Sequence, residues 1–324
     1  APMQGILSLR EKIAAKTEEM YSLKYDPERE ITITSGATQA IFTAISSIIG
    51  EGDEVVIFEP TYDSYIPVIK LNGGKPVYVQ MKSPDFHIDW EEVQKMINSR
   101  TRMIIINTPH NPTGKVFTAR DMEKLQKIVN GTNILLLSDE VYEHIIYDGL
   151  EHQSIARYPK LAERAFIISS FGKTYHTTGW KIGYCLAPEN FMAEFRKIHQ
   201  FLVYAVNSPV QHAFSDYLDN KAAYLELGDF YQKKRDFFMS LFEDSKFKIR
   251  PSSGTYFQLI DYSEVSDEKE VDFAQRLIKE FGVASIPVSV FYHDIVNDHM
   301  LRFCFAKSEE TLEKAAERIL KAGG

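Results

Sequence analysis

Hydrophobic residues recur at two spacings along this chain, and the two spacings alternate. Between residues 5 and 23 the apolar residues stand three or four apart with charges between them, which is typical of an amphipathic helix. Short and almost wholly apolar runs follow, which are typical of strands buried on both faces. These runs lie at 54–58, 103–106, 134–137 and 165–169. Helical patterns separate them, for example the one predicted over 37–49 that ends at Gly50.

This alternation predicts an α/β fold whose mainly parallel sheet has helices on both faces. Long helical stretches are predicted over 191–204 and from about 209 to 242. We expect a large domain over 1–220 and a smaller α/β domain over 221–324. Strands in the smaller domain are predicted at 254–259 and 300–305. Ligands of parallel sheets bind beyond the carboxyl ends of the strands, so the motifs at those ends carry the functional prediction.

Composition narrows the class of protein. The 324 residues are 44% hydrophobic and 25% charged, and the net charge is −8 without a basic tract, which argues against nucleic acid or an anionic membrane as a partner. The apolar runs are too short to cross a bilayer. Cys185 and Cys304 stand alone in apolar runs, so we expect buried free thiols and a reducing, cytoplasmic location. The nine histidines are scattered, and no metal site is expected.

Lys173 follows the apolar run 165–169 in the segment Ser-Phe-Gly-Lys-Thr-Tyr-His. A primary amine at a strand's end, flanked by a glycine turn, can reach the aldehyde of a cofactor, and Ser170 and Lys181 can hold an anion nearby. A lone lysine in such a place is more often simply solvated. The segments below supply the other groups that a Schiff-base lysine needs.

Ser35-Gly36-Ala37-Thr38 connects a strand to the start of an apolar helix. The unpaired N–H groups and the positive end of the helix dipole can bind a phosphate there. The alternative is an ordinary turn containing glycine.

Asn111 lies in Asn-Thr-Pro-His-Asn-Pro-Thr-Gly, a rigid loop with two prolines that leaves a buried strand. Its amide can bind a phenolic oxygen of a cofactor and a substrate carboxylate, although two plain turns would also explain the loop. Asp139 follows the apolar run 134–137 and needs a cation, for which a protonated pyridine nitrogen is suitable. Tyr142 can reach the phenolic oxygen of the same ring. The alternative for Asp139 is the N-cap of a helix.

Tyr62 and Arg302 complete the set. Tyr62 follows a strand and can stack on a cofactor ring, although an aromatic residue there is more often part of the core. Arg302 is a single cation in an apolar strand and can bind a substrate carboxylate through both nitrogens of its guanidinium. An internal ion pair is the alternative for Arg302.

These motifs together resemble the class I aminotransferases of the pyridoxal-phosphate fold type I group, over nearly the whole chain. The segments at 107–112, 138–144 and 170–176 are most similar to bacterial methionine aminotransferases, with the kynurenine and glutamine aminotransferases as further relatives. The resemblance implies a seven-stranded sheet in the large domain, pyridoxal 5′-phosphate as cofactor, and a homodimer with its active site at the subunit interface.

The resemblance also assigns roles to matching positions. Lys173 is the catalytic Schiff-base lysine. Asp139 pairs with the pyridine nitrogen, Tyr142 and Asn111 contact the phenolic oxygen, and Tyr62 stacks on the ring. The phosphate is held by Ala37, Thr38, Ser170 and Lys181. Arg302 and Asn111 bind the substrate carboxylate. Relatives usually carry an amino-terminal arm with a tyrosine that reaches the partner's phosphate, and we expect that arm to lie outside these 324 residues.

We therefore expect an aminotransferase that moves the amino group of an apolar or aromatic amino acid to a 2-oxo acid. Methionine-like donors come first, with kynurenine and glutamine also considered. One alternative is a cysteine-conjugate β-lyase on the same fold. Another is a regulator that binds the cofactor without catalysis, which the presence of both Lys173 and Asp139 disfavours.

Overall fold

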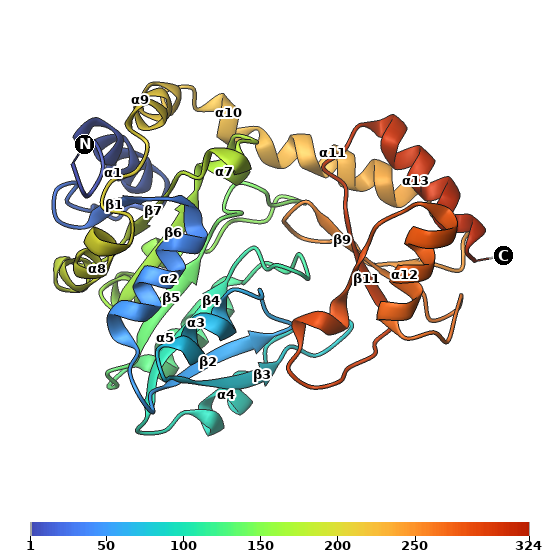
Figure 1. Ribbon diagram of the computed structural model, residues 1–324, viewed down its shortest axis with the longest axis horizontal. Helices are drawn as coiled ribbons and strands as arrows, with labels where there is room; N and C mark the ends of the chain where they lie inside the picture. The colour runs from blue at the N-terminus through green and yellow to red at the C-terminus, as the bar shows by residue number, and fades with distance from the viewer. Residues whose placement is uncertain (1, 324) are drawn as a thin grey trace.

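Seven strands form the sheet of the larger lobe in the structure, a computed structural model that describes residues 2–323 (Figure 1). Their order across the sheet is β1-β7-β6-β5-β4-β2-β3. The strands are β1 (Ile31–Thr34), β2 (Glu54–Glu59), β3 (Lys75–Gln80), β4 (Thr101–Asn107), β5 (Leu135–Asp139), β6 (Ala165–Ser170) and β7 (Gly183–Leu186). β7 runs antiparallel to both neighbours, and the remaining adjacent pairs are parallel. The predicted seven-stranded, mainly parallel α/β architecture is confirmed.

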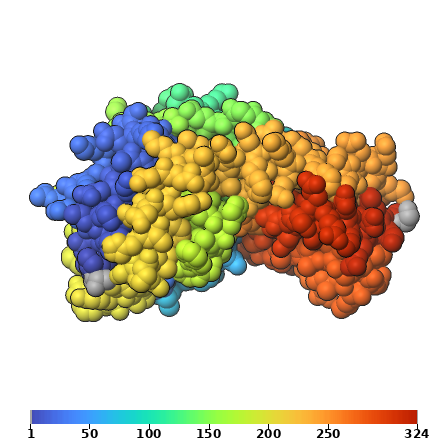
Figure 2. Space-filling model, turned by 90° about the horizontal axis from the view of Figure 1, so that it is seen from above, coloured from blue at the N-terminus to red at the C-terminus, as the bar shows by residue number. Residues whose placement is uncertain are grey.

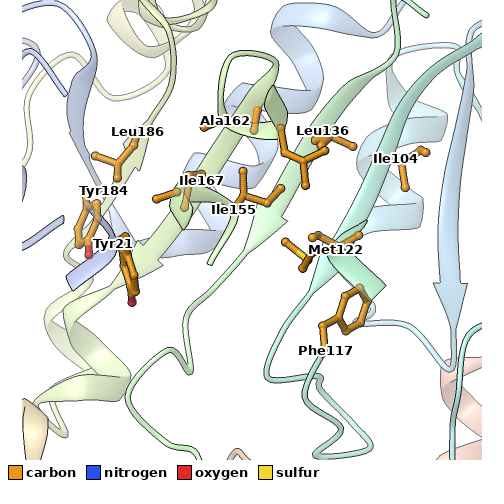
Figure 3. Packing of buried hydrophobic residues seen from close by; sticks show 14 of the residues in the cluster. Tyr21, Ile104, Phe117, Met122, Leu136, Ile155, Ala162, Ile167, Tyr184 and Leu186 are labelled. Carbon is orange, nitrogen blue, oxygen red and sulfur yellow. The ribbon is translucent and has the colours of Figure 1, made fainter. Parts of the chain in front are cut away.

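Both faces of this sheet are apolar, because each central strand sends alternate side chains to opposite sides. Ile104 and Ile106 of β4 join one buried cluster, and Met103 and Ile105 join another. The first cluster is covered by α1 (Leu7–Tyr21), α4 (Trp90–Met96) and α5 (Ala119–Val129). The second is covered by α2 (Gly36–Ile48), α3 (Tyr65–Leu71) and α8 (Glu189–Leu202). Figure 3 shows the first cluster, where side chains from successive strands line one face of the sheet.

A second, antiparallel sheet forms the smaller lobe, with the order β10-β11-β9-β8. Its strands are β8 (Lys248–Ile249), β9 (Phe257–Asp261), β10 (Ile286–Pro287) and β11 (Met300–Cys304). Its helices are α11 (Leu227–Ser240), α12 (Glu270–Phe281) and α13 (Glu309–Lys321). In Figure 1, α11 runs from the larger lobe out over the smaller one. The boundary near residue 220 stays a prediction, because the smaller lobe's apolar cluster also includes Tyr142, Ile145 and Tyr147.

Several predicted boundaries differ from the structure. The helix expected from about 209 to 242 is three helices, namely α9 (Ser208–Tyr217), α10 (Ala222–Leu225) and α11. The polar turn at Asp219 and Asn220 ends the first of them. The sequence pattern predicts strands over 181–186 and 254–259, but these begin later, at Gly183 and Phe257. The reason is that Lys181 and Thr255 have left-handed backbones, with φ of 55° and 65°, that an extended strand cannot contain. The pattern also predicts a helix from about Tyr62 to Leu71, and the structure has it at Tyr65–Leu71.

The exposure of Cys304 differs from the prediction. Its thiol was predicted to be buried, but it lies on the outward side of β11 and is exposed, while Cys185 is buried as expected. Strand alternation explains the difference, because Phe303 takes the inward position beside it. Each helix between residues 2 and 323 is too short or too polar to span a bilayer.

Candidate active site

A pocket lies at the carboxyl ends of the central strands, on the side where such sheets bind ligands. Nine residues predicted to bind the cofactor line it. They are Ala37, Thr38, Tyr62, Asn111, Asp139, Tyr142, Ser170, Lys173 and Lys181. They come from five separate parts of the chain, and parallel packing of the strands brings their ends together. Arg302, from the smaller lobe, contacts this set through Asn111.

The first turn of α2 forms one end of the pocket. The N–H of Ser35 is satisfied by the side chain of Gln39, at 2.9 Å, while Gly36, Ala37 and Thr38 line the pocket. N–H groups in a first helical turn have no partner within the helix, so they are available to an anion. Ser170 and Lys181 line the same pocket and add a hydroxyl and a cation.

Gly183 allows β7 to approach the start of α2 closely. A Cβ at this position would lie 2.8 Å from the carbonyl oxygen of Ser169 and 2.9 and 3.0 Å from backbone atoms of Gly36 and Ala37. Backbone atoms cannot rotate away, so the close packing of strand and helix requires glycine here. The left-handed backbone of Lys181, two residues earlier, turns the chain back toward the pocket.

Lys173 belongs to α7 (Phe171–Thr174), a single turn that directly follows β6. The hydroxyl of Ser170 accepts a hydrogen bond from the N–H of Gly172 at 3.1 Å and so caps this turn. The Lys173 Nζ donates a hydrogen bond to the hydroxyl of Tyr256, which comes from the smaller lobe, at 2.8 Å. The amine therefore lies where the two lobes meet.

Asp139 ends β5 and is 3% exposed. It accepts hydrogen bonds from two neutral donors, the hydroxyl of Tyr65 at 2.6 Å and the N–H of Val141 at 3.3 Å. Burial raises the pKa of this carboxyl to about 6, because these hydrogen bonds only partly offset the loss of water. A buried carboxylate with neutral partners can accept a cation that the chain does not supply. The N-cap alternative does not apply, since no helix begins at Asp139.

Asn111 is held by Asn107, whose side-chain oxygen accepts the N–H of Asn111 at 2.7 Å. The Asn107 amide also donates to the backbone oxygen of Asp139 at 2.9 Å, which links the two strand ends. Arg302 donates from Nη1 to the amide oxygen of Asn111. Among residues 2–323 its hydrogen-bond partner is therefore an amide rather than the carboxylate of an internal ion pair.

The guanidinium of Arg302 lies over two aromatic rings, 4.1 Å from the centroid of Phe257 and 5.1 Å from that of Phe291. Burial lowers its pKa from the ordinary value, although arginine at this depth stays charged. A half-buried cation held by flat aromatic surfaces and one amide keeps free N–H groups for a carboxylate.

A buried polar network supports the turn that carries Asp139 and Tyr142. The Glu143 carboxylate accepts hydrogen bonds of 2.7 Å each from Lys16, Tyr21 and Ser169. Burial is the largest single effect and opposes the charge on Glu143, but the ion pair and hydrogen bond with Lys16, together with the nearby His144 and His152, outweigh it and hold the pKa of Glu143 well below its usual range. In Figure 3 the hydroxyls of Tyr21 and Tyr184 point the same way, and both bind Glu143.

Three side chains that form hydrogen bonds with predicted site residues were not themselves predicted from the sequence: Tyr65, Asn107 and Tyr256. Tyr65 comes three residues after Tyr62, and the two ring centroids are 5.5 Å apart. Because side chains three residues apart are neighbours in a helical turn, this spacing could have pointed to Tyr65. Asn107 opens the same octapeptide as Asn111. Tyr256 is more than 80 residues from Lys173 in the chain, and no local pattern could have joined them.

A seven-stranded lobe, a smaller antiparallel lobe and a pocket at the strand ends define a fold type I transferase. Residues 1–319 match the family model described as aminotransferase class I and II, and the chain belongs to that family. It is therefore an aminotransferase, and this family uses pyridoxal phosphate.

The relatives agree with this assignment. Methionine aminotransferase of Escherichia coli is 48% identical over 320 residues, which cover 98% of this chain and 83% of that protein. The crystal structure of YbdL from Escherichia coli, described as identifying a methionine aminotransferase function, has a TM-score of 0.97 at 47% identity and covers 99% of this chain and 84% of that one. Human kynurenine–oxoglutarate transaminase 1 is 32% identical over 98% of this chain and 83% of its own length.

Proposed function

We propose that this aminotransferase binds pyridoxal 5′-phosphate in the pocket and transfers the amino group of an apolar or aromatic amino acid to a 2-oxo acid. The observation that carries the proposal is that the primary amine of Lys173 and the buried carboxylate of Asp139 line the same pocket. Methionine is the first donor to expect, because a 48% identical relative is a methionine aminotransferase. Kynurenine and glutamine remain further candidates.

The polar groups that line the pocket suit the phosphate, the ring nitrogen and the phenolic oxygen of this cofactor. The first turn of α2, Ser170 and Lys181 match a phosphate, since they supply N–H groups, a hydroxyl and a cation. Asp139, buried beside neutral partners, matches a protonated ring nitrogen. Asn111 and Tyr142 would bind the phenolic oxygen, and Tyr62 would stack on the ring.

When bound, the cofactor supplies an aldehyde that reacts with amines and a ring that accepts electrons from the substrate's Cα. Lys173 would hold that aldehyde in the resting enzyme. With a substrate bound, the Lys173 Nζ would accept the proton from the substrate's Cα and would donate it to the carbon that belonged to the cofactor's aldehyde. Arg302 and Asn111 would fix the substrate carboxylate, so that the Cα–H bond keeps the orientation needed for its cleavage.

Assembly as a homodimer is part of the proposal. Several large apolar side chains are exposed between α7 and α11, and Figure 2 shows the yellow and gold parts of this segment next to one another on one face of the molecule. Exposed apolar residues on one face favour contact with a second copy. The exposed side chains of the segment are Trp180, Phe201, Leu202, Tyr204, Tyr217, Leu225 and Phe230. Sedimentation velocity over a range of concentrations would test this, and a monomer throughout would reject the dimer. The cytoplasmic location stays a prediction.

Substitution of the lysine tests the reaction. Lys173→Ala should abolish the visible absorbance band of the lysine-bound cofactor and lower kcat by several orders of magnitude, because the amine both holds the aldehyde and moves the proton. A panel of amino donors, read by the spectral change from the aldehyde to the amine form of the cofactor, would then rank the substrates. Transamination by Lys173→Ala at a near wild-type rate would refute the assignment. Release of pyruvate and ammonia from a cysteine conjugate, without keto-acid-dependent transfer, would instead show β-elimination.

A further inference from the structure

Tyr256 is a residue of the smaller lobe that the reaction above does not use, although its hydroxyl contacts the reacting amine. It directly precedes β9 and accepts the hydrogen bond of 2.8 Å from the Nζ of Lys173. Between residues 2 and 323, this hydroxyl is the one hydrogen-bond partner of that nitrogen. The smaller lobe therefore supplies the contact that holds the amine of the larger lobe.

The backbone before Tyr256 is anchored to the segment that follows Tyr142. The N–H of Thr255 donates to the carbonyl oxygen of Ile145 at 3.0 Å. The carbonyl oxygen of Thr255 in turn accepts a hydrogen bond from the Tyr147 hydroxyl. Tyr256 is thus tied to the same turn of the larger lobe that brings Tyr142 into the pocket.

Thr255 itself has an unusual conformation. Its φ of 65° is left-handed, which is a strained conformation for a β-branched residue. Such strain persists only where the surrounding structure holds it, and it is concentrated at functional sites. Thr255 is fully buried, and its Oγ1 accepts the N–H of Phe257 at 3.2 Å. Because the Phe305 N–H also donates to the carbonyl oxygen of Tyr256 at 3.0 Å, the backbone of Tyr256 is held on both sides.

The ring of Tyr256 is packed among other aromatic rings. It meets Tyr142 edge-on, with centroids 5.3 Å apart and planes at 85°, and Phe257 at 4.8 Å and 71°. The Tyr231 ring lies 5.8 Å away. Edge-to-face contacts favour one orientation of a ring, so the hydroxyl has a defined position. The Lys173 amine, by contrast, stands on a flexible four-carbon stem that needs an external contact to fix it.

We propose that Tyr256 is a positioning residue: its hydroxyl holds the Lys173 Nζ in place in the cofactor-free chain and while Lys173 moves the proton of a bound substrate. The second part rests on the proposed function above, whereas the contact in the cofactor-free chain does not. A hydrogen bond through one N–H fixes the nitrogen and leaves its remaining positions for the proton that it accepts. Tyr256 keeps its own proton. Correct placement of the reacting atoms accounts for a large part of the rate of such a transfer.

Acetylation of the cofactor-free full chain at one fixed pH tests the contact. Tyr256→Phe keeps the ring and removes only the hydroxyl. The amine must leave its hydrogen bond before it attacks acetic anhydride, so Lys173 should be acetylated on the order of fivefold faster in this variant than in the wild type. Mass spectrometry gives the rate relative to that of the exposed Lys70 in the same sample. Tyr231→Phe, which removes a neighbouring hydroxyl that contacts His176, is the matched control and should equal the wild type.

Single-turnover kinetics of the loaded enzyme test the consequence for the reaction. At saturating methionine, the rate of conversion from the aldehyde to the amine form of the cofactor should fall on the order of tenfold in Tyr256→Phe. The methionine concentration that gives half of this rate should change by less than about twofold, because Arg302 and Asn111 are unchanged. Methionine deuterated at Cα should slow the variant further, since a misplaced Nζ makes proton transfer the slow step. Tyr231→Phe should again equal the wild type.

Equal acetylation rates of Lys173 in the wild type and in Tyr256→Phe would overturn the proposal. Faster acetylation with an unchanged transfer rate, or a slower transfer without an isotope effect, would also overturn it, because the hydroxyl would then not guide the proton transfer. Faster acetylation in a chain that turns over no donor would instead refute the proposed function and leave the contact between Tyr256 and Lys173 intact.

Discussion

Asp139→Asn should stabilise this protein when the cofactor has been removed, although the same change should impair catalysis. Burial raises the pKa of Asp139 from 3.8 to about 6, so the folded chain holds this proton more tightly than the unfolded chain does. The ionised carboxylate therefore weakens folding above about pH 6, and this penalty disappears below about pH 4. The interval between the two pKa values, at about 1.4 kcal/mol per pH unit, gives a penalty of about 3 kcal/mol.

Urea unfolding of the cofactor-free protein at pH 8 and at pH 4 measures this penalty. Asp139→Asn should raise the free energy of unfolding at pH 8 by up to about 3 kcal/mol and have little effect at pH 4. The hydroxyl of Tyr65 can still donate to the amide oxygen, so that hydrogen bond is kept. Added pyridoxal phosphate should stabilise the wild type more than the variant, because a protonated ring nitrogen pairs with a carboxylate and not with an amide. A variant less stable than the wild type at pH 8 would refute this reasoning.

Two further substitutions test the packing around the pocket. Lys16→Met should lower the free energy of unfolding, measured in urea, by about 3–5 kcal/mol, because it leaves the buried Glu143 carboxylate without its cation. The double variant Lys16→Met with Glu143→Gln should recover part of this loss, because the uncompensated charge is then removed as well. Gly183→Ala should weaken pyridoxal phosphate binding about tenfold or more, since its Cβ would force β7 away from the start of α2. Gly179→Ala, whose Cβ would meet nothing within 4 Å, is the control, and equal dissociation constants in a spectral titration would contradict the prediction.

The central part of the fold could be predicted because its strands are buried on both faces. Runs such as 103–106 and 134–137 are apolar at every position, and only a covered parallel sheet buries both sides of a strand. Element ends were less predictable, since they depend on single backbone angles. Lys181 and Thr255 adopt left-handed conformations that lysine and threonine rarely adopt, so the sequence pattern did not predict them.

Much of the candidate site was predictable for a related reason. Asn111, Asp139 and Lys173 each follow a predicted strand, and the carboxyl ends of parallel strands meet at one edge. The partners of these residues were not predictable, because they come from distant parts of the chain. Tyr256 reaches Lys173 from the smaller lobe, and Lys16 reaches Glu143 from α1. Such contacts follow from tertiary packing, which local periodicity does not encode.

Asp139, Glu140 and Glu143 are three buried carboxylates of one turn, and the first and last of them show how this chain separates stability from function. Glu143 is fully provided with partners, including the Lys16 cation, so its charge supports the fold. Asp139, four residues earlier and equally buried, receives only neutral donors and keeps its capacity to bind a cation. Since both lie on one short turn, the rigidity supplied at Glu143 holds Asp139 in a position that is unfavourable for an unpaired charge. A cationic ligand at Asp139 would remove this penalty, so part of its binding free energy is already stored in the folded protein.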